Sequence, residues 1–301
     1  MSIIVPTNAD IQRVLPQIQS IAMLDTGGFK AVYRATIGGH TEALKLIQLP
    51  TSDGSTDAEA FKREMTGRVR REVEALSRCN GPEIVKLGTL ALTPMTINAV
   101  DYVAYSEEFL DGSDLWKLII SGASKPTEPE LRLLFLTLLK AIREVWTLGY
   151  VHRDIKPKNV MKLNNGARQF VLLDFGIAYS VQDTGLTANP TARMPMATYR
   201  YLAPEMMNPT FRETIDYRTD LYTTAMTVYE YAAQRHPLAQ DRDDLMHTIS
   251  RALHQPATPL AAHRSDLSPI LCQTVDQMLK KKPALRPANL NSLIQRMEGG
   301  S

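Results

Sequence analysis

The chain has 301 residues, of which 44% are apolar and 22% charged, as in an ordinary soluble globular protein. This composition excludes a largely disordered chain, and the length allows one large or two modest domains. The 34 lysines and arginines stand against 32 acidic residues and leave a formal charge of +2. Such a near-balance gives no support for a nucleic-acid or membrane-surface partner.

Cysteine use and the N-terminus predict a cytoplasmic protein. The two cysteines, Cys79 and Cys272, are too few for a disulfide scaffold and too far apart for a metal cluster, so we expect reduced thiols. No basic segment precedes an apolar stretch at the N-terminus, which argues against a signal peptide. The most apolar stretch, residues 131–142, is shorter than the roughly 20 residues that span a bilayer and indicates a buried helix.

The first hundred residues predict several strands and one helix. Gly38 and Gly39 between two alternating segments are typical of a hairpin turn. Apolar residues at helical spacing predict a helix over residues 58–78, after a polar loop. We predict strands over residues 18–23, 31–37, 42–49, 84–92 and 99–109.

After Gly112 the pattern becomes helical. Helices are predicted over residues 128–148, 220–234 and 266–281, and short strands over residues 160–163 and 170–173. A small sheet lobe followed by a larger helical lobe is therefore the expected architecture.

The strongest chemical signal is the run YVHRDIKPKN at residues 150–159, followed by LLDFG at residues 172–176. Phosphoryl transfer needs a carboxylate that orients the attacking hydroxyl, oxygen ligands for Mg²⁺, and cations on the phosphates. The oxygens can come from Asp154, Asn159 and Asp174, and the cations from Lys156 and Lys45.

Together these two runs resemble the catalytic loop and the metal-binding triplet of the eukaryotic-type protein kinase family. The resemblance covers residues 18–297 and implies an α+β, bilobal protein kinase-like fold, with a small antiparallel sheet lobe and a larger, mainly helical lobe. It implies ATP and Mg²⁺ as cofactors. Asp154 and Lys156 are then the catalytic residues of the loop, and Asn159 and Asp174 the metal ligands.

The same resemblance divides the chain. Its expected parts are an N-terminal extension (1–17), an N-lobe (18–107), a hinge (108–112), a C-lobe (113–297) and a C-terminal tail (298–301).

Lys45 matches the strand lysine that, in this family, holds the α- and β-phosphates. Glu72 matches the helix glutamate that pairs with this lysine, and its spacing to the following segment is better than that of Glu64 or Glu74. Such a pair serves positioning more than stability.

The adenine site is also assigned by resemblance. Residues 108–112 match the hinge, and Glu107 then occupies the gatekeeper position; a slip of one residue would place Ser106 there. The implied nucleotide-binding residues are Leu24, Gly27, Gly28, Val32, Ala43, Lys45, Glu108, Leu110 and Asp114.

The glycine-rich loop departs from the family pattern. Of the three expected glycines only the middle one, Gly27, is present, while Asp25 and Lys30 occupy the outer positions. Glycines allow the backbone to approach the phosphates closely, so we expect a working but weaker ATP site. Gly28 restores some of the lost freedom.

Three further matches separate protein kinases from small-molecule kinases of the aminoglycoside or choline type. Residues 197–205 resemble the end of the activation segment, Asp220 the buried aspartate that braces the catalytic loop, and Arg286 the arginine that pairs with Glu205. Arg153 is the family's receiver for an activation-segment phosphate. The candidate segment threonines are Thr184, Thr187 and Thr191, with Thr198 expected to help hold Asp154 and Lys156.

Lys156 and Pro157 resemble the serine/threonine branch of the family. Lys158 replaces a glutamate that attracts basic peptides, so we expect an enzyme that is not strongly basophilic. The expected partner is a protein substrate with a serine or threonine acceptor, without nucleic acid or a membrane segment; the sequence does not predict the oligomeric state. The alternative is a pseudokinase or nucleotide-binding scaffold, which only the altered glycine loop and Glu107 favour.

Overall fold

The computed structural model divides the chain into two units, which are described separately. Residues Met1–Arg78 and Val85–Leu110 form the first unit, and Cys79–Ile84 with Asp111–Ser301 form the second. The structure describes residues 3–50, 56–122, 124–174, 179–180, 200–208, 215–240 and 243–299.

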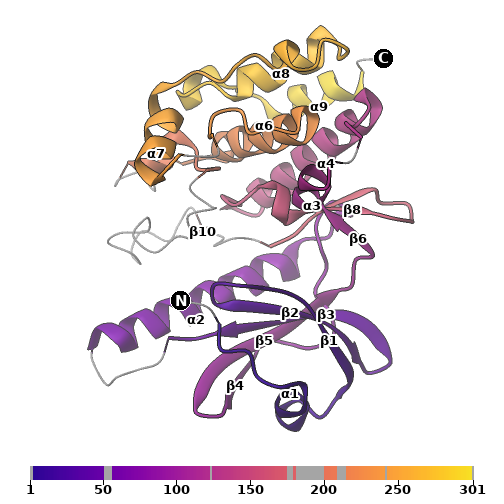
Figure 1. The fold of residues 1–301 in the computed structure, drawn as a ribbon, viewed down its shortest axis with the longest axis vertical. Coiled ribbons are helices and arrows are strands. Elements are labelled where there is room, and N and C mark those ends of the chain that lie inside the picture. The colour runs from indigo at the N-terminus through magenta and orange to yellow at the C-terminus, as the bar shows by residue number, and fades with distance from the viewer. Residues whose placement is uncertain are drawn as a thin grey trace. The chain divides into compact units, whose positions relative to one another are not determined.

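The first unit is built on a five-stranded antiparallel sheet (Figure 1). Gly38 and Gly39, with φ of 57° and 85°, form the predicted hairpin turn, because a two-residue turn of this kind needs positive φ at both positions. The strands, in sheet order, are β1 (Ile18–Gly27), β2 (Lys30–Ile37), β3 (His40–Gln48), β5 (Val100–Glu108) and β4 (Thr93–Ile97).

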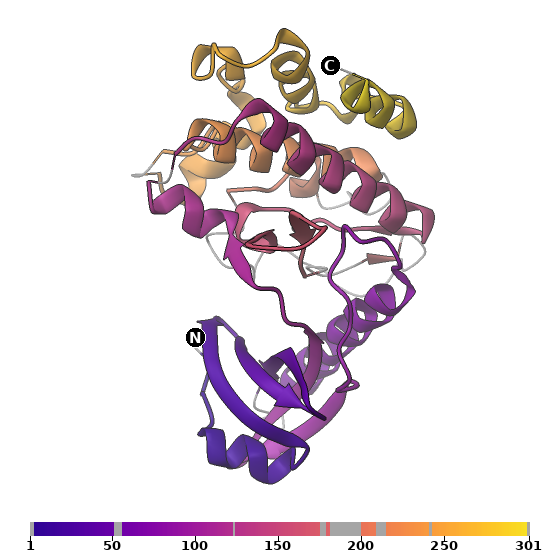
Figure 2. The same cartoon turned by 90° about the vertical axis from the view of Figure 1, so that its right-hand side faces the viewer.

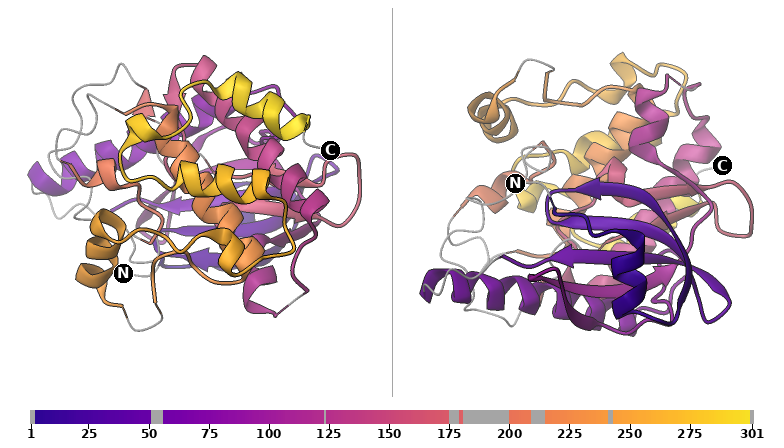
Figure 3. Two further views of the ribbon diagram at one scale, coloured as in Figure 1. Left: turned by 90° about the horizontal axis from the view of Figure 1, so that it is seen from above. Right: turned by 60° about the horizontal axis from the view of Figure 1, so that its bottom comes forward.

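A helix packs against each face of this sheet (Figure 3). Val69 of α2 (Thr56–Arg78) packs with Val103 and Tyr105 on one face. Ile11 of α1 (Asn8–Val14) packs with Leu44 on the other face. Helix α1 was not predicted from the sequence, because a seven-residue helix has too few turns for a periodic signal.

The predicted strand over residues 84–92 is wrong. Only isolated bridges occur there, at Ile84 and Leu87, and the strand that pairs with β5 begins at Thr93. Backbone hydrogen bonds join Lys86, Gly88 and Leu90 to β5 without forming a continuous ladder. A side chain satisfies a further group, since the Thr89 N–H donates to the buried Glu42 carboxylate at 3.0 Å. An apolar run can therefore be extended and anchored without being a ladder strand.

The second unit is mainly helical. Figure 2 shows α4 (Glu128–Thr147) as its long helix, which packs against α6 (Tyr217–Ala233). Thr127 caps α4 by accepting from the Glu130 N–H. Burial on all sides of α6 explains why its periodicity is weak. The remaining helices are α3 (Leu115–Ile120), α7 (Leu245–His254), α8 (Pro269–Met278) and α9 (Leu290–Glu298), and the 3₁₀ turns are η1 (Pro157–Asn159), η2 (Pro204–Met207), η4 (Leu260–Ala262) and η5 (Pro283–Leu285).

Two small sheets in the second unit hold the segments that carry the predicted chemistry. One has the order β6-β8-β9 and the other pairs β7 with β10. Their strands are β6 (Gly112–Asp114), β8 (Val160–Leu163), β9 (Phe170–Leu172), β7 (Tyr150–Val151) and β10 (Tyr179–Ser180). Among the helices that the structure describes, none combines the length and apolarity needed to cross a membrane.

Gly112 is required for β6 to pair with β8. A Cβ at this position would lie 2.2 Å from the Lys162 carbonyl oxygen, a backbone atom that cannot rotate away. We predict that Gly112→Ala lowers the free energy of unfolding by about 1–3 kcal/mol through this overpacking. Urea unfolding at constant m-value measures the loss.

The matched control is Gly67→Ala in α2, where the nearest atom to the added Cβ is the Arg71 Nη1 at 3.6 Å. Alanine is the better helix former by about 1 kcal/mol, so this variant should be as stable as the wild type or more so. Equal stabilities of the Gly112 variant and the wild type would contradict the assignment of β6.

Candidate functional site

The loop between β7 and β8 brings three predicted site residues together. The Lys156 Nζ donates to both carboxylate oxygens of Asp154, at 2.7 and 2.8 Å. The Asn159 Nδ2 donates to the Asp154 Oδ2 at 2.8 Å and to its backbone carbonyl at 2.9 Å. These contacts tie the carboxylate to Lys156 and to the 3₁₀ turn η1, which begins at Pro157 and contains Asn159. The loop therefore presents one oriented carboxylate beside one fixed cation.

Asp220, in the first turn of α6, holds the backbone that precedes Asp154. Its carboxylate accepts from the backbone N–H groups of His152 and Arg153, at 2.8 and 2.7 Å. Arg153 has φ of 69°, a left-handed conformation that a non-glycine residue keeps only when its surroundings impose it. Burial raises the pKa of Asp220 to about 7, although the two N–H donors act in the opposite direction.

The environment of Asp154 favours a proton acceptor. Burial raises the pKa of its carboxyl group above the ordinary value, against the lowering effect of the Lys156 ammonium and of the hydrogen bonds from Lys156 and Asn159. The side chain is still 16% exposed. A carboxylate of raised pKa that solvent and substrate can reach is suited to receive a proton from a bound hydroxyl group.

Asn159 and Asp174 supply the oxygen atoms predicted to hold a cation. Because the Asn159 amide nitrogen donates to Asp154, the amide oxygen is the atom that this residue can offer to a metal. Asp174 follows β9 with φ of 43° and has a partly buried side chain. The Leu173 N–H donates to the Asn159 carbonyl at 2.8 Å, which ties the two segments together. Amide and carboxylate oxygens suit a hard divalent cation.

In the first unit, the predicted phosphate-binding lysine contacts a carboxylate of the sheet. The Nζ of Lys45 donates to the Glu107 Oε1, and both side chains are buried. The hydroxyl group of Tyr105 donates to the Glu72 Oε1 at 2.9 Å. From the sequence, Glu107 was assigned only the gatekeeper position, and Tyr105 was assigned no role. The available signal was a charged residue at the end of an otherwise apolar strand.

Glu64, an alternative to Glu72 in the sequence, and Ser106, the alternative to Glu107, each have another partner. Glu64 forms an ion pair with Arg68 one turn along α2. Ser106 lies on the opposite face of β5 from Glu107, where its hydroxyl donates to the Glu42 Oε2 at 2.5 Å. Glu107, and not Ser106, therefore lies on the same face of the sheet as Lys45.

The predicted nucleotide-binding residues are distributed over both units. In the first unit, Leu24 is exposed on β1, and Gly28 takes φ of 41° in the β1–β2 turn. The Glu108 N–H donates to the Lys86 carbonyl at 2.9 Å. Asp114, in the second unit, caps α3 by accepting from the Lys117 N–H at 2.9 Å. The others lie on β1 (Gly27), β2 (Val32), β3 (Ala43) and two residues after the end of β5 (Leu110).

Asp25, one of the two departures in the glycine loop, is exposed and accepts from the Thr26 N–H at 2.9 Å. Lys30 begins β2 opposite Gly27. The four predicted segment residues Thr184, Thr187, Thr191 and Thr198 lie outside the residues that the structure describes.

The guanidinium group of Arg286 is buried and fully hydrogen-bonded. Its side chain has no exposed surface, and Nη1 and Nη2 donate to the two oxygens of Glu205 at 2.6 and 2.8 Å. The remaining N–H groups donate to the carbonyls of Lys280, Lys281 and Arg218, at 2.8–3.0 Å. All five guanidinium donors are thus used.

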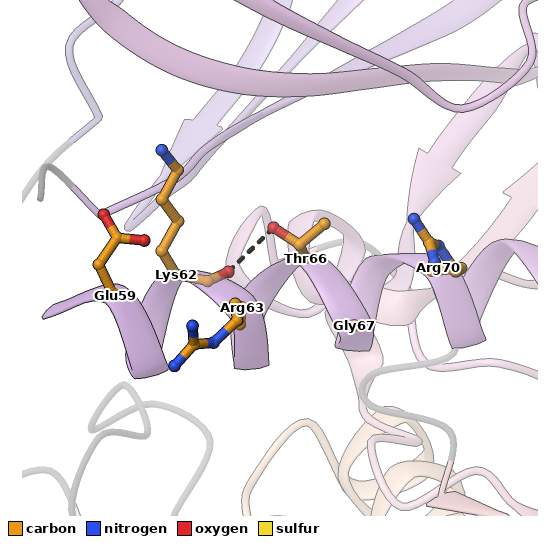
Figure 4. Close-up of a pocket in the computed structure, with 6 residues that line it drawn as sticks. All are labelled: Glu59, Lys62, Arg63, Thr66, Gly67 and Arg70. Carbon is orange, nitrogen blue, oxygen red and sulfur yellow. Dashed lines mark hydrogen bonds between the residues drawn. The ribbon is translucent and has the colours of Figure 1, made fainter. Parts of the chain in front are cut away.

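A surface pocket lies along α2, apart from the predicted site residues (Figure 4). Its floor is one helix face, where the Thr66 hydroxyl donates to the Lys62 carbonyl at 2.9 Å. Lys62 itself forms an ion pair with Asp101 of β5 at 2.6 Å, which ties the helix to the sheet. The lining residues are Glu59, Lys62, Arg63, Thr66, Gly67 and Arg70.

Removal of the Arg286 guanidinium should destabilise the second unit strongly. We predict that Arg286→Met costs about 3–5 kcal/mol of unfolding free energy, because it leaves Glu205 and three carbonyls without their donor. Lys140→Met is the control, since the Lys140–Glu298 pair is exposed and should contribute less than about 1 kcal/mol. Chemical unfolding compares the two; similar losses would refute the prediction.

His152 should make the stability of the protein depend on pH. Burial lowers the pKa of its imidazole from 6.5 to about 4, so between these values the unfolded chain binds the proton more readily. The contribution of the neutral, buried imidazole to the free energy of unfolding is therefore complete above pH 6.5 and is lost as the pH falls towards 4. It amounts to at most about 3 kcal/mol.

We predict that His152→Gln flattens the pH dependence of unfolding free energy between pH 6.5 and 4. His40→Gln, at an exposed position of β3, is the matched control for the loss of an imidazole. Urea titrations at several pH values measure both slopes, and an unaltered slope in the His152 variant would exclude this origin.

Comparison with known proteins identifies the family of this chain. A family model for the protein kinase domain matches residues 19–296. A probable serine/threonine-protein kinase of Streptomyces coelicolor is 34% identical over 221 residues, which are 73% of this chain and 30% of that protein. The serine/threonine-protein kinase PknD of Mycobacterium tuberculosis is 28% identical over 272 residues, 89% of this chain and 37% of that protein.

The fold has solved counterparts. The crystal structure of the Mycobacterium tuberculosis PknI kinase domain, a double mutant, superposes with a TM-score of 0.64 at 21% identity and covers 94% of each chain. This chain spans about a third of the length of the two relatives compared by sequence. Because the family model matches nearly the whole sequence, the chain belongs to the protein kinase domain family.

Proposed function

We propose that this protein is an ATP- and Mg²⁺-dependent serine/threonine protein kinase, which transfers the γ-phosphate of ATP to hydroxyl groups of a protein. The observation that carries the proposal is the position of the Asp154 carboxylate. Lys156 and Asn159 fix it by hydrogen bonds, and Asp220 accepts from the backbone just before it. Phosphoryl transfer depends mainly on positioning and charge, and this loop supplies both.

Asp154 receives the proton of the acceptor hydroxyl in this mechanism. Its raised pKa makes the carboxylate a better acceptor than an aspartate in water. Lys156 serves two partners: it holds Asp154 in the free enzyme, and its ammonium can neutralise the charge of the phosphoryl group during transfer. Lys45, in the first unit, is the cation proposed for the α- and β-phosphates.

Asn159 and Asp174 are the residues proposed to hold Mg²⁺. The fit rests on their donor set, an amide oxygen and a carboxylate, since hard divalent cations prefer oxygen ligands. When bound, the ion neutralises phosphate charge and orients the phosphates. The anchoring of Asn159 by its two hydrogen bonds to Asp154 keeps the base and the metal ligand in one geometry.

The loop and the relatives support a serine or threonine acceptor. Lys156 and Pro157 match the serine/threonine branch, and the relatives named above are serine/threonine-protein kinases. Lys158 is exposed and places a positive charge next to this site, which disfavours substrates rich in arginine.

The decisive test is phosphate transfer from radiolabelled ATP to a generic protein acceptor, with Mg²⁺ and with Asp154→Asn as the control. We predict label on serine or threonine with the wild type and a loss of at least about 100-fold in the variant, because the carboxylate is removed without a change in size. Omission of Mg²⁺ should abolish the label. ATP binding without transfer by the wild type would identify a pseudokinase instead.

The same reaction tests autophosphorylation. We propose that one of Thr184, Thr187 and Thr191 receives phosphate, with Arg153 as the partner of the new charge, as expected for a regulated protein kinase. Mass spectrometry of the wild type after incubation with ATP should find phosphate within residues 177–197. Transfer to the acceptor with an unmodified segment would rule out this regulation.

A further inference from the structure

The first unit buries an ion pair between two neighbouring strands. Lys45 on β3 and Glu107 on β5 contact each other, with side chains 5% and 3% exposed. In the sheet register Lys45 lies opposite Tyr105, and Ala43 lies opposite Glu107. Lys45 and Glu107 are therefore diagonal neighbours on one face, close enough for long side chains to meet.

Tyr105 extends this contact towards α2. The Lys45 Nζ lies 5.3 Å from the centre of the Tyr105 ring, which favours a cation over its face. The hydroxyl of the same ring donates to Glu72 at 2.9 Å. The ammonium thus has two contacts on the sheet itself, and the Glu72 carboxylate, which accepts from this tyrosine, lies within 4.8 Å of the Glu107 carboxylate.

Burial makes the partnership of Lys45 and Glu107 obligatory. A buried ammonium group is strongly disfavoured unless a carboxylate and further polar or aromatic groups surround it. Removal of one partner leaves the other as an uncompensated charge. Because both side chains project from paired strands, their relative position is set by backbone hydrogen bonds and not by the placement of a helix.

We propose that Glu107 is a positioning residue for Lys45: the sheet carboxylate fixes the ammonium that contacts the ATP phosphates, and Glu72 supports it in second place. The inference rests on the proposed kinase function, which gives Lys45 its ligand. It goes beyond that function by moving the main partner of the lysine from the helix to the strand.

The test compares Glu107→Gln with Glu72→Gln. Each substitution removes one carboxylate charge and keeps the size of the side chain. The kinase assay supplies kcat and the KM for ATP, and calorimetry supplies the Kd for Mg²⁺–ATP. We expect Glu107→Gln to lower kcat/KM by about 100-fold, the typical result of a misplaced catalytic group. Glu72→Gln should lose less than about tenfold, and Glu107→Asp should recover part of the activity.

A second comparison separates positioning from general stability. If Glu107 acts through Lys45, then Glu107→Gln should change the Kd for Mg²⁺–ATP by less than about twofold when introduced into Lys45→Met, although it weakens binding strongly in the wild type. An equal effect in both backgrounds would overturn the proposal. So would a Glu107→Gln enzyme as active as the wild type or more active, or a larger loss in Glu72→Gln.

Thermal unfolding covers the case in which a variant is too unstable to assay. Each single substitution at Lys45 or Glu107 should lower Tm by about 5 °C or more, and the double variant Lys45→Met/Glu107→Gln should recover part of that loss. Additive losses would refute the pairing. If the wild type transfers no phosphate, the proposed function fails, while the Tm comparison still decides whether the pair exists.

Discussion

The carboxylate of Asp220 holds in place the short loop on which the proposed chemistry depends. It accepts from two consecutive N–H groups, at His152 and Arg153, from inside the protein. The left-handed conformation of Arg153 costs about 1–2 kcal/mol for a non-glycine residue and would relax without this acceptor. Because Asp154 follows directly, the backbone that Asp220 holds also sets the direction of the Asp154 side chain.

The first turn of α6 joins this loop to a second polar network. Thr219, next to Asp220, donates to the Glu205 Oε1 at 2.8 Å, and the Arg218 carbonyl accepts from Arg286 at 2.9 Å. Three consecutive residues of one helix therefore contact the loop that precedes Asp154, the segment that carries Glu205, and the arginine after α8. Because α6 is buried on all sides, its apolar packing fixes both networks at once. A shift of this helix would disturb both together.

Local patterns predicted the parts of the structure that depend on near neighbours in the sequence. The glycine pair of the β2–β3 turn, the helix that follows it and the motif around Asp154 were readable for that reason. The wrong strand at residues 84–92 and the missed role of Glu107 share another cause. Thr89 is held by Glu42, 47 residues away, and Lys45 meets Glu107 across 62 residues. Side-chain contacts over such separations leave no periodic signal, and only the family resemblance pointed to Asp220 and to Arg286.

The register of β3 against β5 shows why these long-range contacts are nevertheless specific. Glu42 and Ser106 meet on one face of the sheet, and Lys45 and Glu107 meet on the other. A slip of one residue would turn every side chain of one strand to the opposite face. Glu42, Lys45 and Glu107, whose charged side chains are all buried, would then lose their partners, at a cost of several kcal/mol for each. The two polar pairs therefore reject the alternative register that apolar residues alone would tolerate, and they fix the strand position from which the Lys45 side chain projects.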